Sequence, residues 1–186
     1  STPLEKAEQL LDGLTPEERV GQLFLITFTG ANAPAESQIY DLIANYHIGA
    51  VMLRRDQDNF VAEPSTLAGL SSLIGNLQAA EQTSSVTERA DVLSGDVYTP
   101  SYIPLFVALN QEGDGYPNDQ IMAGLSPLPS AMTLGATWNP VLARSTGQML
   151  GEELSMLGIN MLIGPSLDVL ETPRPQSLGD LGTRSF

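Results

Sequence analysis

Two patterns of apolar residues alternate along this chain. Four short, nearly continuous apolar runs predict buried strands, at residues 23–28, 49–53, 103–109 and 159–163. Between the runs lie segments in which apolar residues recur every three or four positions, which predicts helices at residues 35–46, 64–82 and 140–157. Strands and helices in strict alternation predict an α/β fold with a parallel sheet and right-handed crossovers.

The amino-terminal residues predict two further helices. Residues 4–14 carry apolar side chains at helical spacing. Thr15 is a favoured N-cap residue, Pro16 suits the first helical position, and Glu18 completes a capping box. Asn139, which precedes a proline, marks the start of the last predicted helix in the same way.

Four strand–helix units amount to half of a (β/α)8 barrel. A complete barrel takes about 250 residues, whereas this chain has 186. We therefore expect a partial TIM barrel, made of the first four βα units, with residues 1–186 as the N-terminal part of a longer domain. Residues 83–102 are polar and lack a regular period, so we expect an inserted or mobile loop there. Because a half barrel leaves its sheet edges open, we expect it to self-associate or to pair with the remainder of the barrel.

Composition restricts the partners. The chain has 22 acidic and 8 basic residues, a net charge of −14, which argues against nucleic acid and anionic membranes because both bind basic patches. No apolar run approaches the roughly 20 residues of a membrane span. With no cysteine and a single histidine, His47, we expect no metal or cofactor, and His47 is interpreted as structural. Residues 114–119 are rich in oxygen ligands but lack calcium-loop spacing, which favours a plain acidic turn.

Polar side chains that could carry chemistry follow the predicted strands directly. Asn110, Gln111 and Glu112 come after the third apolar run, and Asp168 comes after the fourth. In parallel α/β folds, the carboxyl ends of the strands form the ligand-binding edge. Glu112 and Asp168 are the candidate catalytic residues, because paired carboxyl groups can cleave glycosidic bonds. The alternative is that both carboxylates only brace loops.

Several stretches in sequence order carry a family resemblance. The series reads Leu-Thr-Pro-Glu-Glu-Arg-Val-Gly-Gln-Leu at 14–23, His-Ile-Gly-Ala-Val-Met-Leu at 47–53, Asn-Gln-Glu-Gly-Asp at 110–114, Ser-Pro-Leu-Pro-Ser-Ala-Met-Thr-Leu-Gly at 126–135, Leu-Gly-Ile-Asn at 157–160 with Leu-Asp-Val at 167–169, and Arg-Ser-Phe at 184–186. In this order it resembles the N-terminal barrel domain of glycoside hydrolase family 3. The bacterial β-N-acetylglucosaminidase branch, which reads Asp-Gln-Glu-Gly-Gly and Arg-Ser-Phe-Gly, is the most similar.

The resemblance implies hydrolysis of O-glycosyl bonds in β-N-acetylglucosaminides or β-glucosides, with retention of configuration. It also implies that the nucleophile and the acid/base lie on later segments. The chain alone is then inactive, and Glu112 and Asp168 are braces. Asn110 stands where the family has an aspartate that accepts hydrogen bonds from sugar hydroxyls. Arg184 matches an arginine that contacts the sugar, so Asn110 and Arg184 are the expected substrate-binding residues. Asn118 replaces an arginine of the branch.

The departures at Asn110 and Asn118 keep a second hypothesis open, a non-catalytic carbohydrate-binding or assembly domain derived from the same fold. Tyr116 and Trp138 could stack on sugar rings, although the place of Trp138 beside a helix N-cap favours a packing role. We expect a carbohydrate partner and an extracytoplasmic or secreted location, with the cytoplasm as the alternative. The lack of cysteine is compatible with export.

Overall fold

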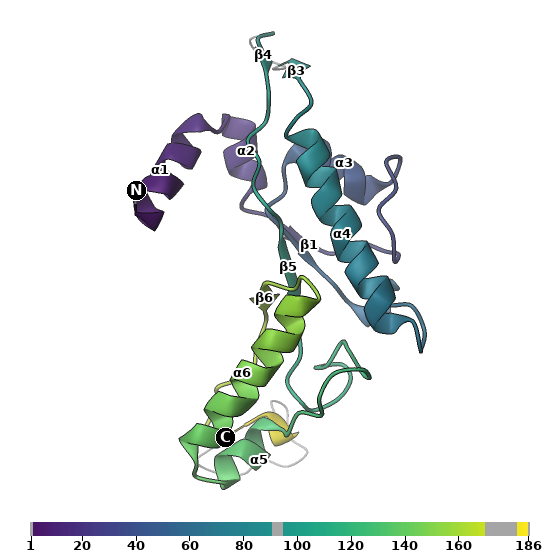
Figure 1. Cartoon of the computed structure of the whole chain (residues 1–186), viewed down its shortest axis with the longest axis vertical. Helices are drawn as coiled ribbons and strands as arrows, with labels where there is room; N and C mark the ends of the chain where they lie inside the picture. Colours follow the sequence, from purple (N-terminus) through teal and green to yellow (C-terminus); the bar gives the residue numbers. More distant parts are fainter. Residues whose placement is uncertain (1, 91–94, 170–181, 186) are drawn as a thin grey trace.

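The main sheet has four parallel strands whose order follows the sequence. The computed structural model describes residues 2–90, 95–169 and 182–185. The strand order is β1–β2–β5–β6, with β1 at Leu25–Ile26, β2 at Ala50–Met52, β5 at Phe106–Leu109 and β6 at Met161–Leu162. All three pairings are parallel. This order confirms the α/β fold and the first four βα units of a parallel barrel (Figure 1).

Helices connect these strands, as the apolar spacing predicts. They are α1 at Pro3–Gly13, α2 at Pro16–Gly21, α3 at Gln38–Tyr46, α4 at Thr66–Ser84, α5 at Ala131–Ala136 and α6 at Pro140–Met156, with short 3-10 turns η1 at Arg55–Gln57 and η2 at Gly182–Arg184. The Thr15 hydroxyl accepts the Glu18 N–H and the Glu18 carboxylate accepts the Thr15 N–H, the predicted capping box. Asn139 caps α6 by accepting the Val141 N–H at 3.0 Å. No helix in the described ranges is long and apolar enough to cross a bilayer.

Two parts of the sequence-based prediction differ from the structure. The strands are shorter than their apolar runs, and β1 keeps only two residues of the predicted 23–28. Helix α5 was not predicted, because its six residues are too few to display a period.

The region 83–102, where we expect an inserted or mobile loop, begins with the end of α4. Its described residues also include a small antiparallel ribbon, β3 at Arg89–Ala90 with β4 at Val97–Tyr98.

The hydrophobic core lies on one face of the sheet, under α3 and α4. Val51, Val107 and Leu109 point to this face and are completely buried, together with Leu70 and Leu77 of α4. Burying each of these side chains stabilises the fold by about 1.5–3 kcal/mol.

The opposite face is partly open in the described part of the chain. Leu25, Ala50 and Phe106 form one register row. Leu25 and Phe106 remain 45% and 51% exposed, whereas Ala50 and Ala108 are buried. The apolar run at residues 103–109 predicts a buried strand, and this prediction is wrong at Phe106. The interior of a barrel is filled only when strands converge from all sides, and these four strands leave large apolar side chains exposed on this face.

The buried side-chain amide of Asn59 holds two loops together at the ends of the strands. The Asn59 side chain donates to the carbonyls of Phe28 and Gly30 at 3.0 and 2.8 Å and accepts the Arg54 N–H at 2.8 Å. It thereby joins the loop after β1 to the loop after β2. Because buried backbone groups need partners, this one side chain fixes the carboxyl edge of the sheet on the β1–β2 side.

Candidate functional site

The loop that leaves β5 is held in a fixed shape by its own polar groups. The Gln111 side chain both donates to the Ile121 carbonyl and accepts the Ile121 N–H, each at 3.0 Å. The Asn110 carbonyl accepts the Gln120 N–H at 3.1 Å. Residues 110–121 thus fold back on themselves and carry Glu112 over the carboxyl edge of the sheet.

Asp119 fixes the tip of the same loop. Its carboxylate accepts the backbone N–H groups of Glu112, Gly113 and Gly115, the last two at 2.9 and 2.7 Å. Such charge-assisted bonds are about twice as strong as neutral ones. The acidic stretch 114–119 is therefore organised around its own backbone, as expected of a plain acidic turn. Within the described part of the chain, no three His, Asp or Glu side chains come together in a way that could hold a metal ion.

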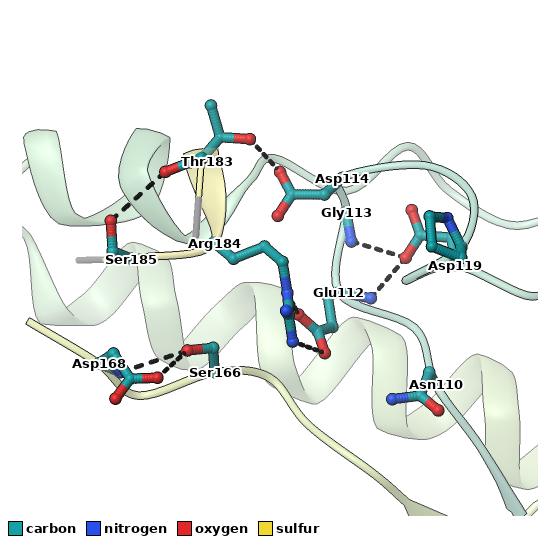
Figure 2. Close-up of polar contacts among 12 residues, drawn as sticks. Asn110, Glu112, Gly113, Asp114, Asp119, Ser166, Asp168, Thr183, Arg184 and Ser185 are labelled. Atoms are coloured by element: carbon teal, nitrogen blue, oxygen red, sulfur yellow. Dashed lines mark hydrogen bonds and ion pairs between the residues drawn. The ribbon is translucent and has the colours of Figure 1, made fainter. Parts of the chain in front are cut away.

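Glu112 and Arg184 form the central ion pair of the site. Arg184 donates from Nε to Oε2 at 2.7 Å and from Nη2 to Oε1 at 3.1 Å (Figure 2). The Glu112 side chain is 3% exposed and the Arg184 side chain 30% exposed. The hydrogen bond with Glu112 raises the pKa of Arg184 above its ordinary value, and the charges of Asp114 and Asp168 act in the same direction. Gly164 lies against Glu112, because a Cβ there would stand 2.7 Å from Oε1.

The two candidate catalytic carboxylates are engaged in different ways. Both oxygens of Glu112 are bound by Arg184. Asp168 is exposed and accepts a hydrogen bond from the Ser166 hydroxyl at 2.6 Å. Figure 2 shows Asp168 on the segment that follows β6, where its drawn contacts go to Ser166 and not to Glu112 or Arg184. This arrangement favours the bracing role for Glu112, because both of its oxygens face Arg184 and its side chain is only 3% exposed.

Asn110 and Arg184, the two expected substrate-binding residues, lie at the same edge of the sheet. Asn110 follows β5, and its amide nitrogen donates to the Ile163 carbonyl, directly after β6, at 2.7 Å. Arg184 lies at this edge because it binds Glu112, which follows Asn110 by two residues in the sequence. Thr183 also donates to Asp114, which holds η2 beside the loop after β5. The amide oxygen of Asn110 is the atom left to accept a hydrogen bond from a ligand.

A small cavity beside Asn110 was not predicted from the sequence. It has a volume of about 80 Å³ and lies between the ends of β2 and β5, with Arg54, Asp56, Tyr116 and Gln120 among its lining residues. The feature of the sequence that could have indicated this cavity is the charged pair Arg54-Arg55, directly after the second apolar run. The sequence could not assign Arg54 a role, because its neighbour Tyr116 is far along the chain.

The fold defines a class of protein, the parallel α/β barrels, in which ligands bind at the carboxyl ends of the strands. Comparisons with known proteins narrow the class. Residues 15–186 match the family model described as the glycosyl hydrolase family 3 N-terminal domain, and the chain belongs to this family.

Individual relatives and structures agree with the family. "Beta-hexosaminidase A" of Pseudoalteromonas piscicida is 29% identical over 139 residues, which cover 73% of this chain and 20% of that protein. "Probable beta-glucosidase E" of Aspergillus fumigatus is 41% identical over 46 residues, which cover 25% of this chain and 4% of that protein. The structure of a glycoside hydrolase family 3 β-N-acetylglucosaminidase from Paenibacillus sp. superimposes with a TM-score of 0.68 at 28% identity, over 87% of this chain and 26% of that one. The chain thus spans only a small part of the length of these proteins.

Proposed function

We propose that this chain forms the amino-terminal part of the sugar pocket of a retaining β-glycosidase. The whole protein would hydrolyse β-linked N-acetylglucosaminides, with β-glucosides as the second substrate class. One observation carries the proposal: a buried glutamate, Glu112, holds Arg184 bidentately beside Asn110 at the carboxyl edge of the sheet. The relatives named β-hexosaminidase and β-glucosidase support the same range of substrates.

The geometry of Arg184 suits a neutral polyhydroxylated ligand. A guanidinium group carries five N–H donors in a rigid fork, and Glu112 takes two of them. The remaining donors can bind sugar oxygens, while the Asn110 amide oxygen accepts from a hydroxyl group. Because Glu112 cancels the charge of Arg184, the pair does not select for an anionic ligand.

Catalysis requires groups outside these residues. Retaining hydrolysis needs two carboxyl groups about 5 Å apart, one of them free to attack the sugar. Both oxygens of Glu112 bind Arg184, and Asp168 lies on an exposed segment. The nucleophile and the acid/base are assigned to other segments of the whole protein, and this chain alone is inactive.

A specific observation favours a second function, a carbohydrate-binding domain without catalysis. The residue at the sugar-contacting position is Asn110, and its nitrogen is directed to the Ile163 carbonyl. An asparagine forms a weaker hydrogen bond with a hydroxyl group than a carboxylate does. Hydrolysis of a nitrophenyl β-N-acetylglucosaminide by the full-length protein supports the enzyme, and sugar binding without hydrolysis supports the binding domain.

Sugar binding by the chain itself tests the common part of both functions. In saturation-transfer NMR with N-acetylglucosamine, Arg184→Lys should weaken binding several-fold, because lysine keeps the charge next to Glu112 but loses the fork. Arg144→Lys, at an exposed position of α6, is the matched control and should bind as the wild type does. Equal binding by both variants would contradict the role given to Arg184.

A further inference from the structure

Trp138 is the only tryptophan of the chain, and it lies open to solvent. It is 92% exposed, more than any other large hydrophobic residue in the described ranges. Tryptophan side chains are highly buried on average in folded proteins. The packing role expected from its place beside a helix N-cap is therefore wrong, and the indole contributes little to the core.

The turn that carries Trp138 does not explain this residue either. Its backbone is in the left-handed conformation, with a φ of 50°, which is an outlier for a bulky side chain and suits glycine or asparagine. The Trp138 N–H donates to the Gly135 carbonyl at 3.0 Å, and the Thr137 hydroxyl accepts the Asn139 N–H at 3.2 Å. A strained and exposed residue that is fixed in this way indicates a role for its side chain outside the fold.

Trp138 lies on the same side of the molecule as the proposed sugar site. It follows helix α5 by two residues, and α5 contacts η2, the turn that ends with Arg184. Figure 1 shows α5 and the first turn of α6 beside this segment. Helix α5 therefore links the exposed indole to the segment that holds Arg184.

The segment that carries Trp138 is uncharged. No residue between Asp119 and Arg144 carries a charge, although the chain has 22 acidic and 8 basic residues. The Asn139 side chain accepts the Val141 N–H through its oxygen, and its amide nitrogen donates to no residue in the described ranges. An indole face attracts polarised C–H groups such as those of a sugar ring, and a neighbouring amide can donate to a hydroxyl group. These groups suit a neutral glycan and offer no counter-charge to an ionic ligand.

The area of this surface favours a glycan over a protein partner. A tryptophan side chain offers about 150–250 Å², whereas a stable protein interface buries about 800 Å² on each partner. The exposed Val141 and Leu142 that follow have smaller side chains and do not close this gap. A ring stacked on the indole needs no more than the indole's own area.

We propose that Trp138 is a stacking platform for a neutral, β-linked oligosaccharide whose terminal sugar is held by Asn110 and Arg184. A ring further along the oligosaccharide lies on the indole face, and the Asn139 amide donates to one of its hydroxyl groups. This inference rests on the proposed function and names its substrate class, chains of several sugars that bind more tightly than a monosaccharide.

The fluorescence of Trp138 reports on this surface alone, because the chain has no other tryptophan. The probes are N-acetylglucosamine and its β-1,4-linked tetramer, and ¹H–¹⁵N spectra of the same samples follow Asn110 and Glu112. Both sugars should shift the Asn110 and Glu112 signals. Only the tetramer should move the Trp138 emission to shorter wavelength, because only the tetramer reaches the indole. Tetragalacturonate, an anionic tetramer, should leave the emission unchanged, and an equal shift would contradict the neutral class.

Calorimetry on variants gives a second readout. The wild type should bind the tetramer about three- to tenfold more tightly than the monomer, the range for one aromatic stacking contact. Trp138→Asn, which suits the left-handed turn, should lose this difference and bind the monomer as the wild type does. Trp138→Tyr keeps an aromatic face and should retain part of the difference. Tyr46→Asn, at the exposed last residue of α3, is the matched control and should change neither affinity.

The outcomes separate this inference from the proposed function. If the monomer perturbs Asn110 and Glu112 but the tetramer leaves the Trp138 emission unchanged, or if both sugars move it equally, the platform is refuted and the sugar site stands. An emission shift on raising the protein concentration without sugar would make Trp138 a contact between copies of the chain, which also overturns the inference. If neither sugar perturbs Asn110 or Glu112, the proposed function fails, and the inference fails with it.

Discussion

Single buried polar side chains determine much of the local geometry at the carboxyl edge. Asn59 is 1% exposed and satisfies backbone groups in two loops that are otherwise separate in the chain. Replacing it with alanine leaves the Arg54 N–H and three carbonyls, those of Phe28, Gly30 and Gln57, without this partner. Each such loss costs about 1–3 kcal/mol, although water entering the space would recover part of it.

We expect Asn59→Ala to lower the free energy of unfolding by about 2–4 kcal/mol. Asn76→Ala, at an exposed position of α4, is the control and should change it by less than about 0.5 kcal/mol. Urea denaturation followed by circular dichroism measures both. A stability of Asn59→Ala equal to that of the control would show that the two loops do not depend on this residue.

His47 gives the fold a dependence on pH. It ends α3 in the left-handed conformation, with a φ of 52°. The pKa of His47 is lowered from its ordinary value of 6.5, and burial is the largest cause of this shift. A histidine with a lowered folded pKa stabilises the protein fully above 6.5, and this stability is lost as the pH falls through the folded pKa. Asparagine tolerates the left-handed conformation and does not titrate.

The urea midpoint of the wild type should therefore fall more between pH 7.5 and pH 5.5 than that of His47→Asn. The chain has one histidine, so the difference between the two proteins isolates its titration. Parallel pH profiles for the two proteins would mean that His47 is not buried in its neutral form.

At the level of residues, sequence reasoning identified types of residue better than their partners. The capping residues Thr15 and Asn139 were predictable because a cap depends on neighbours within three positions. Glu112 and Arg184 are 72 positions apart in the sequence. The sequence therefore indicated a bracing role for Glu112 but could not identify Arg184 as its partner. Trp138, predicted to pack, is 92% exposed, because its neighbouring helix buries other positions.

Among the elements, α4 anchors the segment that leads into β5. Glu81, on α4, accepts the Ile103 N–H at 3.2 Å, and Glu18 accepts the Ser101 N–H at 2.8 Å. The pKa of Glu81 is raised from its ordinary value of 4.5, and burial is the largest cause. The negative charge of Glu18 also raises this pKa, whereas the Ile103 N–H and the charge of Arg89 lower it. For a raised pKa, the stabilising contribution is present below pH 4.5 and is lost as the pH rises through the folded pKa.

Glu81→Gln should therefore raise the urea midpoint at pH 7, because glutamine keeps the acceptor for Ile103 and removes the buried charge. The gain should shrink as the pH is lowered toward 4.5. Glu88→Gln, at an exposed position nearby, should show no such gain. A lower midpoint for Glu81→Gln at pH 7 would mean that the attraction to Arg89 outweighs the cost of burial.

The existence and order of the elements followed from periodicity, while their lengths did not. Parallel strands are defined by pairing with neighbours. Among the described residues, β1 pairs with β2 alone, so part of its apolar run stays unpaired. The spacing of apolar residues could not reveal α5, because this helix has only six residues after its N-cap Ser130.

For the whole molecule, the open face of the sheet is the main consequence of having four strands. Leu23 and Leu25 are exposed at the edge of the sheet formed by β1, and Phe106 is exposed on the inner strand β5. Exposed apolar patches and free strand edges promote association. We expect the chain to self-associate as its concentration rises, which light scattering after size-exclusion chromatography measures.

Phe106→Ser and Leu25→Lys should each shift this association toward the monomer. Val86→Lys, at an exposed position two residues after the end of α4, is the matched control and should leave the association unchanged. A monodisperse wild-type monomer at millimolar concentration would show that the open face is not adhesive.

The most direct test of the account is where N-acetylglucosamine binds on this chain. In a ¹H–¹⁵N titration, we expect the perturbed signals to cluster at Asn110, Glu112, Gly113 and the Arg184 side chain, which Figure 2 shows together. Arg184→Lys should reduce these shifts several-fold at equal sugar concentration. Perturbations confined to another surface, or shifts of the same size in Arg184→Lys, would contradict the assignment of this edge as a sugar site.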